Sequence, residues 1–122
     1  MSDYQLGNIE SSFADIIWEK EPIQSAELVK ISEEKFGWKK STTYTVLKRL
    51  CEKGIFKNNN GTVISLISRE DFYSAKSEKF VDESFGGSLP AFIAAFTKRK
   101  NLNKEEIEQI RKMIDDYKGD LQ

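Results

Sequence analysis

Hydrogen-bonding and cationic side chains repeat along one face of a helix that the sequence predicts between Trp38 and Gly54. Their separations of three, four and seven residues place them on a single stripe. The four residues are Ser41, Tyr44, Thr45 and Lys48. Solvated helix faces usually mix Glu with Lys, so a stripe of hydroxyls beside an ammonium group indicates a polar partner.

Positive charge is concentrated on the same segment. Six cations and one acid, Glu52, lie between residues 39 and 57, although the formal net charge of the 122-residue chain is −1. The cations are Lys39, Lys40, Lys48, Arg49, Lys53 and Lys57. Such a concentration is typical of phosphate binding, and the eight acids and two bases of residues 1–34 should repel phosphate from the opposite face. The alternative is an ordinary amphipathic helix with a solvated cationic face.

The elements around this helix favour phosphate binding. Its other face carries an apolar stripe at the same spacing, which we expect to be buried: Thr43, Val46, Leu47 and Leu50. Strand-forming runs follow at residues 55–57 and 63–67, and the Asn-Asn-Asn-Gly sequence between them is a tight-turn signal. A helix followed by a hairpin is the order of a winged helix-turn-helix, whose second helix enters the major groove of DNA.

This interpretation gives the polar residues roles on double-stranded DNA. The residues expected to bind it are Lys39, Lys40, Ser41, Thr42, Tyr44, Thr45, Lys48, Asn59 and Asn60. Thr42, Tyr44 and Thr45 are expected to read the major groove, while the lysines hold phosphates. The two asparagines are expected to touch the backbone or the minor groove, unless they serve turn chemistry alone.

Two further helices are predicted before this segment. Apolar residues at helical spacing predict the first over residues 9–18, with Ser11 or Ser12 available as its cap. Ser25 can cap the second, which is expected to end near Gly37. The predicted order is therefore helix, helix, recognition helix and hairpin.

Three more helices are predicted after residue 68, with caps at Ser68, Ser88 and Asn103. Their stripes are too rich in Phe and Ile to be covered within about fifty residues, so a second copy of the chain is the expected cover. The residues expected in that homodimer interface are Phe80, Leu89, Phe92, Ile93, Phe96, Ile107, Ile110 and Ile114. The alternative is that these helices fold back onto the winged helix of the same chain.

These patterns together predict a mainly α fold with a small β-hairpin. A winged helix-turn-helix DNA-binding domain is expected over residues 1–68, and an α-helical dimerisation domain over residues 69–122. Hydrophobic residues make up 39% of the chain and charged residues 32%, which is normal for a globular protein.

Enzyme and metal chemistry lack their usual residues. The chain has no histidine and a single cysteine, Cys51, and it has no catalytic-serine, phosphate-loop, paired-cysteine or EF-hand pattern. We expect no catalytic activity, no metal site and no cofactor, and a packing role for Cys51 rather than a redox or metal role. No apolar run of about 18 residues and no signal-peptide pattern occurs, which favours a cytoplasmic location.

The chain resembles the penicillinase-repressor family of the BlaI/MecI type over nearly its whole length. The segments that carry the resemblance are Ile17-Trp18, Trp38–Leu50, Phe85-Gly-Gly-Ser-Leu89, Phe96 and Leu102–Ile107. The resemblance implies a homodimeric transcriptional repressor that binds palindromic operators upstream of antibiotic-resistance genes. It also implies inactivation by proteolysis, triggered through a membrane-bound sensor of β-lactams.

The resemblance also implies roles for individual residues. The DNA-contacting positions of the family fall on Ser41, Thr42, Tyr44 and Thr45, and its cleavage bond falls between Ala95 and Phe96. Family members often have Lys, Arg and Asn where this chain has Ser41, Tyr44 and Ala95. A related copper-responsive branch carries cysteines at its C-terminus, and this chain has none there. Two alternatives stay open, namely a winged-helix module that docks an acidic protein and a repressor with another inducer.

Overall fold

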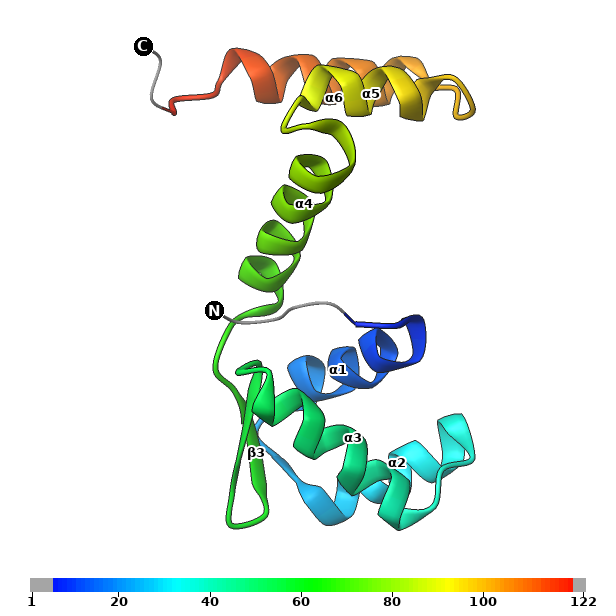
Figure 1. The fold of residues 1–122 in the computed structure, drawn as a ribbon, viewed down its shortest axis with the longest axis vertical. Helices are drawn as coiled ribbons and strands as arrows, with labels where there is room; N and C mark the ends of the chain where they lie inside the picture. The colour runs from blue at the N-terminus through cyan, green and yellow to red at the C-terminus, as the bar shows by residue number, and fades with distance from the viewer. Residues whose placement is uncertain (1–5, 120–122) are drawn as a thin grey trace. The chain divides into compact units, whose positions relative to one another are not determined.

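The computed structural model describes residues 6–119, which form two compact units that divide between Lys79 and Phe80 (Figure 1). The helices are α1 (Asn8–Lys20), α2 (Ser25–Phe36), α3 (Lys40–Glu52), α4 (Arg69–Phe85), α5 (Leu89–Thr97) and α6 (Lys104–Asp115). The strands are β1 (Ile23–Gln24), β2 (Phe56–Asn59) and β3 (Thr62–Ser65). The predicted fold class, a winged helix-turn-helix followed by a helical region, is confirmed.

The first unit is built around one hydrophobic core. Helix α2 packs on α3, α1 packs on β3, and α3 packs on β2, so the core lies between the three helices and the small sheet (Figure 1). The apolar stripe of α3 is buried as predicted, at Thr43, Val46, Leu47 and Leu50. Phe13 from α1, Leu28 from α2 and Phe56 from β2 complete the same cluster.

The hairpin turns more tightly than expected. Asn60 and Gly61 alone form the turn, and both have positive φ, 52° and 93°, which a two-residue hairpin turn with the right-handed strand twist requires. The side-chain Oδ1 of Asn58 accepts a hydrogen bond from the Gly61 N–H at 2.9 Å. Because the turn needs only two residues, β2 continues to Asn59, beyond the end expected at residue 57.

A third strand was missed by the sequence analysis. The two residues of β1 pair antiparallel with β3, Ile23 opposite Val63 and Gln24 opposite Thr62, which gives the strand order β1-β3-β2. Two residues are too few to show the alternation by which a strand is recognised. This short pairing ties the linker between α1 and α2 to the hairpin.

Two predicted helix caps are wrong. Helix α1 begins at Asn8, so Ser11 and Ser12 lie inside it, and the Ser12 hydroxyl donates to the Asn8 carbonyl oxygen at 3.1 Å. Gln24 occupies the cap position of α2, and Ser25 is the first residue of the helix. At the start of α1 the Gly7 N–H donates instead to Glu10 Oε1 at 3.2 Å, and at α2 the last extended residue is Gln24, one position before the predicted serine.

The caps predicted for the later helices are confirmed. The hydroxyl oxygens of Ser68 and Ser88 accept the backbone N–H groups of residues 71 and 91, each at 3.1 Å. Asn103 and Glu106 form a reciprocal capping box, with bonds of 2.8 and 3.2 Å.

The division between the units falls inside α4. Phe72, near the start of α4, is fully buried and belongs to the core of the first unit. The domain boundary expected after residue 68 stays a prediction. In the second unit Phe80, Phe85 and Phe92 pack edge to face, with ring centroids 5.6–6.0 Å apart, yet none of its described side chains is fully buried.

Candidate nucleic-acid interface

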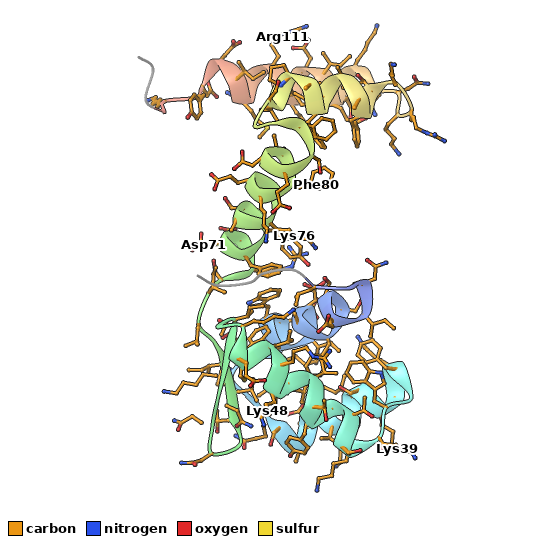
Figure 2. All side chains as sticks on the ribbon, in the orientation of Figure 1. Lys39, Lys48, Asp71, Lys76, Phe80 and Arg111 are labelled. Atoms are coloured by element: carbon orange, nitrogen blue, oxygen red, sulfur yellow. The ribbon has the colours of Figure 1, made fainter. Side chains whose placement is uncertain are left out.

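Helix α3 offers a polar face opposite its buried stripe. Figure 2 shows Lys39 at the start of this helix and Lys48 further along it. The exposed side chains in and beside this face are Lys39, Lys40, Ser41, Thr42, Thr45 and Lys48. The stripe of Ser41, Thr45 and Lys48 is exposed because helical periodicity places it opposite the stripe that is buried.

The cations of this segment divide into two groups. Arg49 forms an ion pair with Glu10 of α1, with Nη1 and Oε2 3.3 Å apart, so it faces α1 rather than the polar face. Partial burial would raise the pKa of Glu10, but the Gly7 N–H, the Arg49 guanidinium and the charge of Lys53 together hold it below its ordinary value.

Four of the remaining cations are available to an external anion. Lys39, Lys40, Lys48 and Lys57 form no ion pair with another residue of the described range 6–119. The set of cations available to bind an anion is therefore smaller than the six that the sequence suggested.

Tyr44 differs from the rest of its stripe. Its ring is half-buried against the core, and its hydroxyl donates to the Oγ of Ser25, on the first turn of α2, at 3.1 Å. The groove-reading role expected for Tyr44 stays a prediction. The structure adds that this hydroxyl already has a partner within the protein.

The hairpin tip is held by the last residue of β1 and the first residue of α2. The Ser25 N–H donates to the Gly61 carbonyl oxygen at 2.7 Å, and Gln24 Nε2 donates to Thr62 Oγ1 at 3.2 Å. Asn59 and Asn60 are exposed beside these bonds. No sequence pattern marks Gln24 or Ser25 as neighbours of the hairpin, since only the register of β1 on β3 brings them there.

A groove of about 520 Å³ lies between α3 and the hairpin, with Lys48 and Lys57 beside an apolar lining. The remaining lining residues are Tyr44, Leu47, Cys51, Phe56, Asn58 and Leu66. Burial raises the pKa of the Cys51 thiol, a hydrogen bond with the Asn58 backbone opposes part of this shift, and the charge of Glu52 adds to it. A raised pKa lowers the thiolate fraction, which accords with the packing role expected for Cys51. Among residues 6–119 no three His, Cys, Asp or Glu side chains cluster as metal ligands would.

The second unit carries the residues predicted for dimerisation and cleavage. Ala95 and Phe96 lie in the last turns of α5 and are exposed, Phe96 to 47%. A small apolar cavity of about 160 Å³ lies between α5 and α6 and includes Phe92, Ile93, Phe96 and Ile110 in its lining. The remaining predicted interface residues lie at or near the surface as well: Phe80, Leu89, Ile107 and Ile114.

In the part of the chain that the structure describes, no helix is both long enough and apolar enough to cross a membrane.

Comparison with known proteins identifies relatives along nearly the whole chain. The family described as penicillinase repressor matches residues 6–116. The methicillin resistance regulatory protein MecI of Staphylococcus aureus is 24% identical over 115 residues, which cover 91% of this chain and 94% of MecI. The penicillinase repressor of Bacillus licheniformis is 25% identical over 119 residues, covering 94% and 93% of the two chains. The penicillinase repressor of Staphylococcus aureus is 27% identical over 106 residues, or 84% of each chain.

Proposed function

This chain belongs to the penicillinase repressor family of transcriptional repressors, and on that premise we propose that it is a homodimeric, sequence-specific DNA-binding repressor of β-lactam resistance genes. Two copies of α3 bind the half-sites of a palindromic operator. Proteolysis in the helical unit, started by a membrane-bound sensor of β-lactams, relieves the repression. The names of the relatives, which concern penicillinase and methicillin resistance, support the class of target gene.

The observation that carries the DNA-binding proposal is the division of α3 into two faces. Four residues of one face are buried in the core, so a rotation of the helix would expose them to solvent. The other presents hydroxyls at Ser41, Thr42 and Thr45 beside lysines that have no described anionic partner. Thr42 and Thr45 are suited to base edges, and the lysines to phosphates.

The hairpin supplies a second point of contact. Asn59 and Asn60 are exposed at the tip of β2 and the turn, and Lys57 projects from the same strand. Amide and ammonium groups of this kind bind the backbone that flanks the major groove. A recognition helix and a wing that bind together fix the register of the protein on DNA better than either element does alone.

The exposed apolar residues of the second unit support a homodimer. Phe80, Leu89 and Ile114 are each more than half exposed, although they belong to amphipathic helices. Apolar area of this extent is unusual on the surface of a monomer, and a second copy covers it by two-fold symmetry. Two tethered α3 helices then bind adjacent half-sites at high effective concentration, which raises affinity without any new contact.

Cleavage between Ala95 and Phe96 would end the joint binding of the two α3 helices to adjacent half-sites. The bond lies in α5, so scission separates α6 from the DNA-binding unit and removes Ile107, Ile110 and Ile114 from it. A protease binds extended backbone, so α5 must open locally before the bond is cut. The remaining monomeric DNA-binding units would dissociate from the operator at cellular concentrations.

Fluorescence anisotropy tests the DNA-binding proposal. The purified chain is titrated with a labelled duplex that carries the inverted repeat upstream of its own gene, with a scrambled duplex of equal length as control. A repressor binds the inverted repeat at least about a thousandfold more tightly at physiological salt. Equal affinity for the two duplexes contradicts the proposal and favours the docking of an acidic protein.

The release mechanism is tested in cells. Cultures are exposed to a β-lactam, the repressor is followed by immunoblot, and the fragment termini are identified by mass spectrometry. New termini at Ala95 and Phe96 before induction support proteolytic relief. A full-length repressor in cells that already express the target genes contradicts it and favours another inducer.

A further inference from the structure

We propose that the Tyr44 hydroxyl is a positioning group, which acts through Ser25 to hold the hairpin tip at a fixed distance from α3. This inference rests on the proposed function, since it concerns how the two DNA-contacting elements are aligned. It assigns to Tyr44 and Ser25 a role in coupling those elements instead of a direct contact with a base.

Ser25 is the point at which three elements meet. Its Oγ accepts the hydroxyl of Tyr44 from α3 at 3.1 Å, while its backbone N–H donates to the Gly61 carbonyl oxygen of the hairpin turn at 2.7 Å. Only 9% of Ser25 is exposed. One residue at the start of α2 therefore connects the recognition helix to the wing tip.

Gly61, in the hairpin turn, lies near the side chain of Ser25. A Cβ placed on Gly61 would lie 3.7 Å from Ser25 Oγ, so a side chain at this position of the turn would contact the hydroxyl. The neighbouring bond from Gln24 to Thr62, and the pairing of β1 with β3, hold the same corner of the hairpin. A displacement of Ser25 thus moves the turn with it.

The Tyr44 hydroxyl is poorly placed to be a free base-reading group. Its hydroxyl donates to Ser25, and its half-buried ring packs against the core. The hydroxyl of Thr45 also has an intrahelical partner, the Ser41 carbonyl oxygen at 2.9 Å, but that side chain remains exposed and joins no second element. Among the described residues of the four-residue stripe, Tyr44 is thus the one whose hydroxyl bonds to another element.

The consequence is a coupling between helix and wing. With the bond intact, contact of α3 with the major groove places Asn59 and Asn60 at a set distance along the DNA. Without it, the hairpin keeps its turn but samples more positions, and DNA binding must order it at an entropic cost. Affinity should fall while the order of preference among bases is kept.

A double-mutant cycle with Tyr44→Phe and Ser25→Ala tests the proposal in the full-length chain. Each single change leaves one hydroxyl without its partner, and operator affinity should fall about three- to tenfold. The double change removes both hydroxyls, so its affinity should be no lower than that of either single variant. Tyr73→Phe, which removes a tyrosine hydroxyl from α4, is the matched control and should bind as the wild type does.

Two further readouts separate positioning from a general structural effect. Amide hydrogen exchange at Ser25 in the DNA-free protein should accelerate in Tyr44→Phe, while exchange in the α1 core stays unchanged. The base preference of Tyr44→Phe, measured with single-base operator variants, should match that of the wild type. Thr45→Val is the contrasting variant, expected to alter base preference and to leave exchange at Ser25 unchanged.

Several results would overturn the proposal. One is a changed base preference in Tyr44→Phe together with normal operator affinity in Ser25→Ala. Another is a double variant whose loss of affinity equals the sum of the two single losses. The third is normal operator affinity in both single variants. If the wild type binds operator and scrambled DNA alike, the proposed function itself fails. The exchange comparison then still decides whether Tyr44 and Ser25 restrain the wing.

Discussion

The two units of the chain differ in how far their large apolar side chains are exposed to solvent. In the first unit Phe13, Phe56 and Phe72 are each at most 1% exposed, whereas in the second unit Phe80, Leu89 and Phe96 are each about half exposed. The helices of both units carry comparable apolar stripes. The difference lies in what covers them, because three helices and a sheet enclose the first set.

This contrast shows which part of the molecule is complete as a single chain. A closed core stabilises the first unit without a partner, so its polar face can serve DNA without supporting the fold. The apolar residues of α5 and α6 face solvent, which is costly and supports the proposed homodimer. Four substitutions test this contrast, in decreasing order of expected effect.

The largest effect is expected from Phe13→Ala. Phe13 is fully buried and stacks on Trp38 with ring centroids 5.4 Å apart, so truncation should cost about 3–5 kcal/mol of unfolding free energy. Urea unfolding followed by tryptophan fluorescence measures it, since both tryptophans, Trp18 and Trp38, lie in the first unit. Phe80→Ala, at a residue 52% exposed, should leave that unfolding curve unchanged. Equal losses in the two variants would contradict the contrast between the units.

Ile110→Asp should have the next largest effect, on association rather than on folding of the first unit. A carboxylate placed without a partner in the proposed interface costs about 3 kcal/mol or more, which raises the dimer dissociation constant about a hundredfold. Sedimentation equilibrium measures the change. Gln109→Asp, one residue away on α6, introduces the same charge and should associate normally. A wild-type chain that remains monomeric at micromolar concentration would remove the basis for a dimer and favour helices that fold back on their own chain.

Lys48→Ala should weaken DNA binding through charge alone. Loss of each charge-assisted phosphate contact should reduce affinity about tenfold at low salt for operator and scrambled duplexes alike. The slope of log affinity against log salt should decrease in magnitude by about one for each subunit bound, and so by about two for the proposed dimer. Anisotropy titrations at several salt concentrations measure both, with Lys104→Ala in α6 as the control. A loss confined to the operator would instead place Lys48 on a base.

Glu10→Gln should have the smallest effect, and one that depends on pH. The pKa of Glu10 is lower in the folded chain, so its ion pair with Arg49 stabilises the fold above the ordinary carboxyl pKa and is lost as pH falls through the lowered value. The variant should be at most about 1 kcal/mol less stable at neutral pH, and this difference should shrink as pH falls below the ordinary carboxyl pKa and vanish once pH is below the lowered value. Urea unfolding across the acid range measures it, with Glu34→Gln as control. A difference that persisted in acid would assign the effect to packing.

Local patterns in the sequence determined much of the first unit. The stripe from Thr43 to Leu50 predicted which face of α3 is buried, because helical periodicity alone decides which side chains share a face. The Asn-Gly pair predicted the hairpin turn, since few other residues tolerate positive φ there. Ser88 and Asn103 predicted two helix starts for an equally local reason, as an N-cap bonds a backbone group three residues away.

Only the tertiary structure decided which of the candidate DNA-binding groups are already engaged. Tyr44 and Ser25 are 19 residues apart, and Arg49 and Glu10 are 39 apart, so no spacing rule links either pair. Their contacts depend on how α1 and α2 pack against α3, and that packing is set by the summed burial of side chains across the core. The sequence by itself therefore determined the two faces of the recognition helix. Packing determined which of its hydroxyls and charges bond to other elements of the protein and which do not.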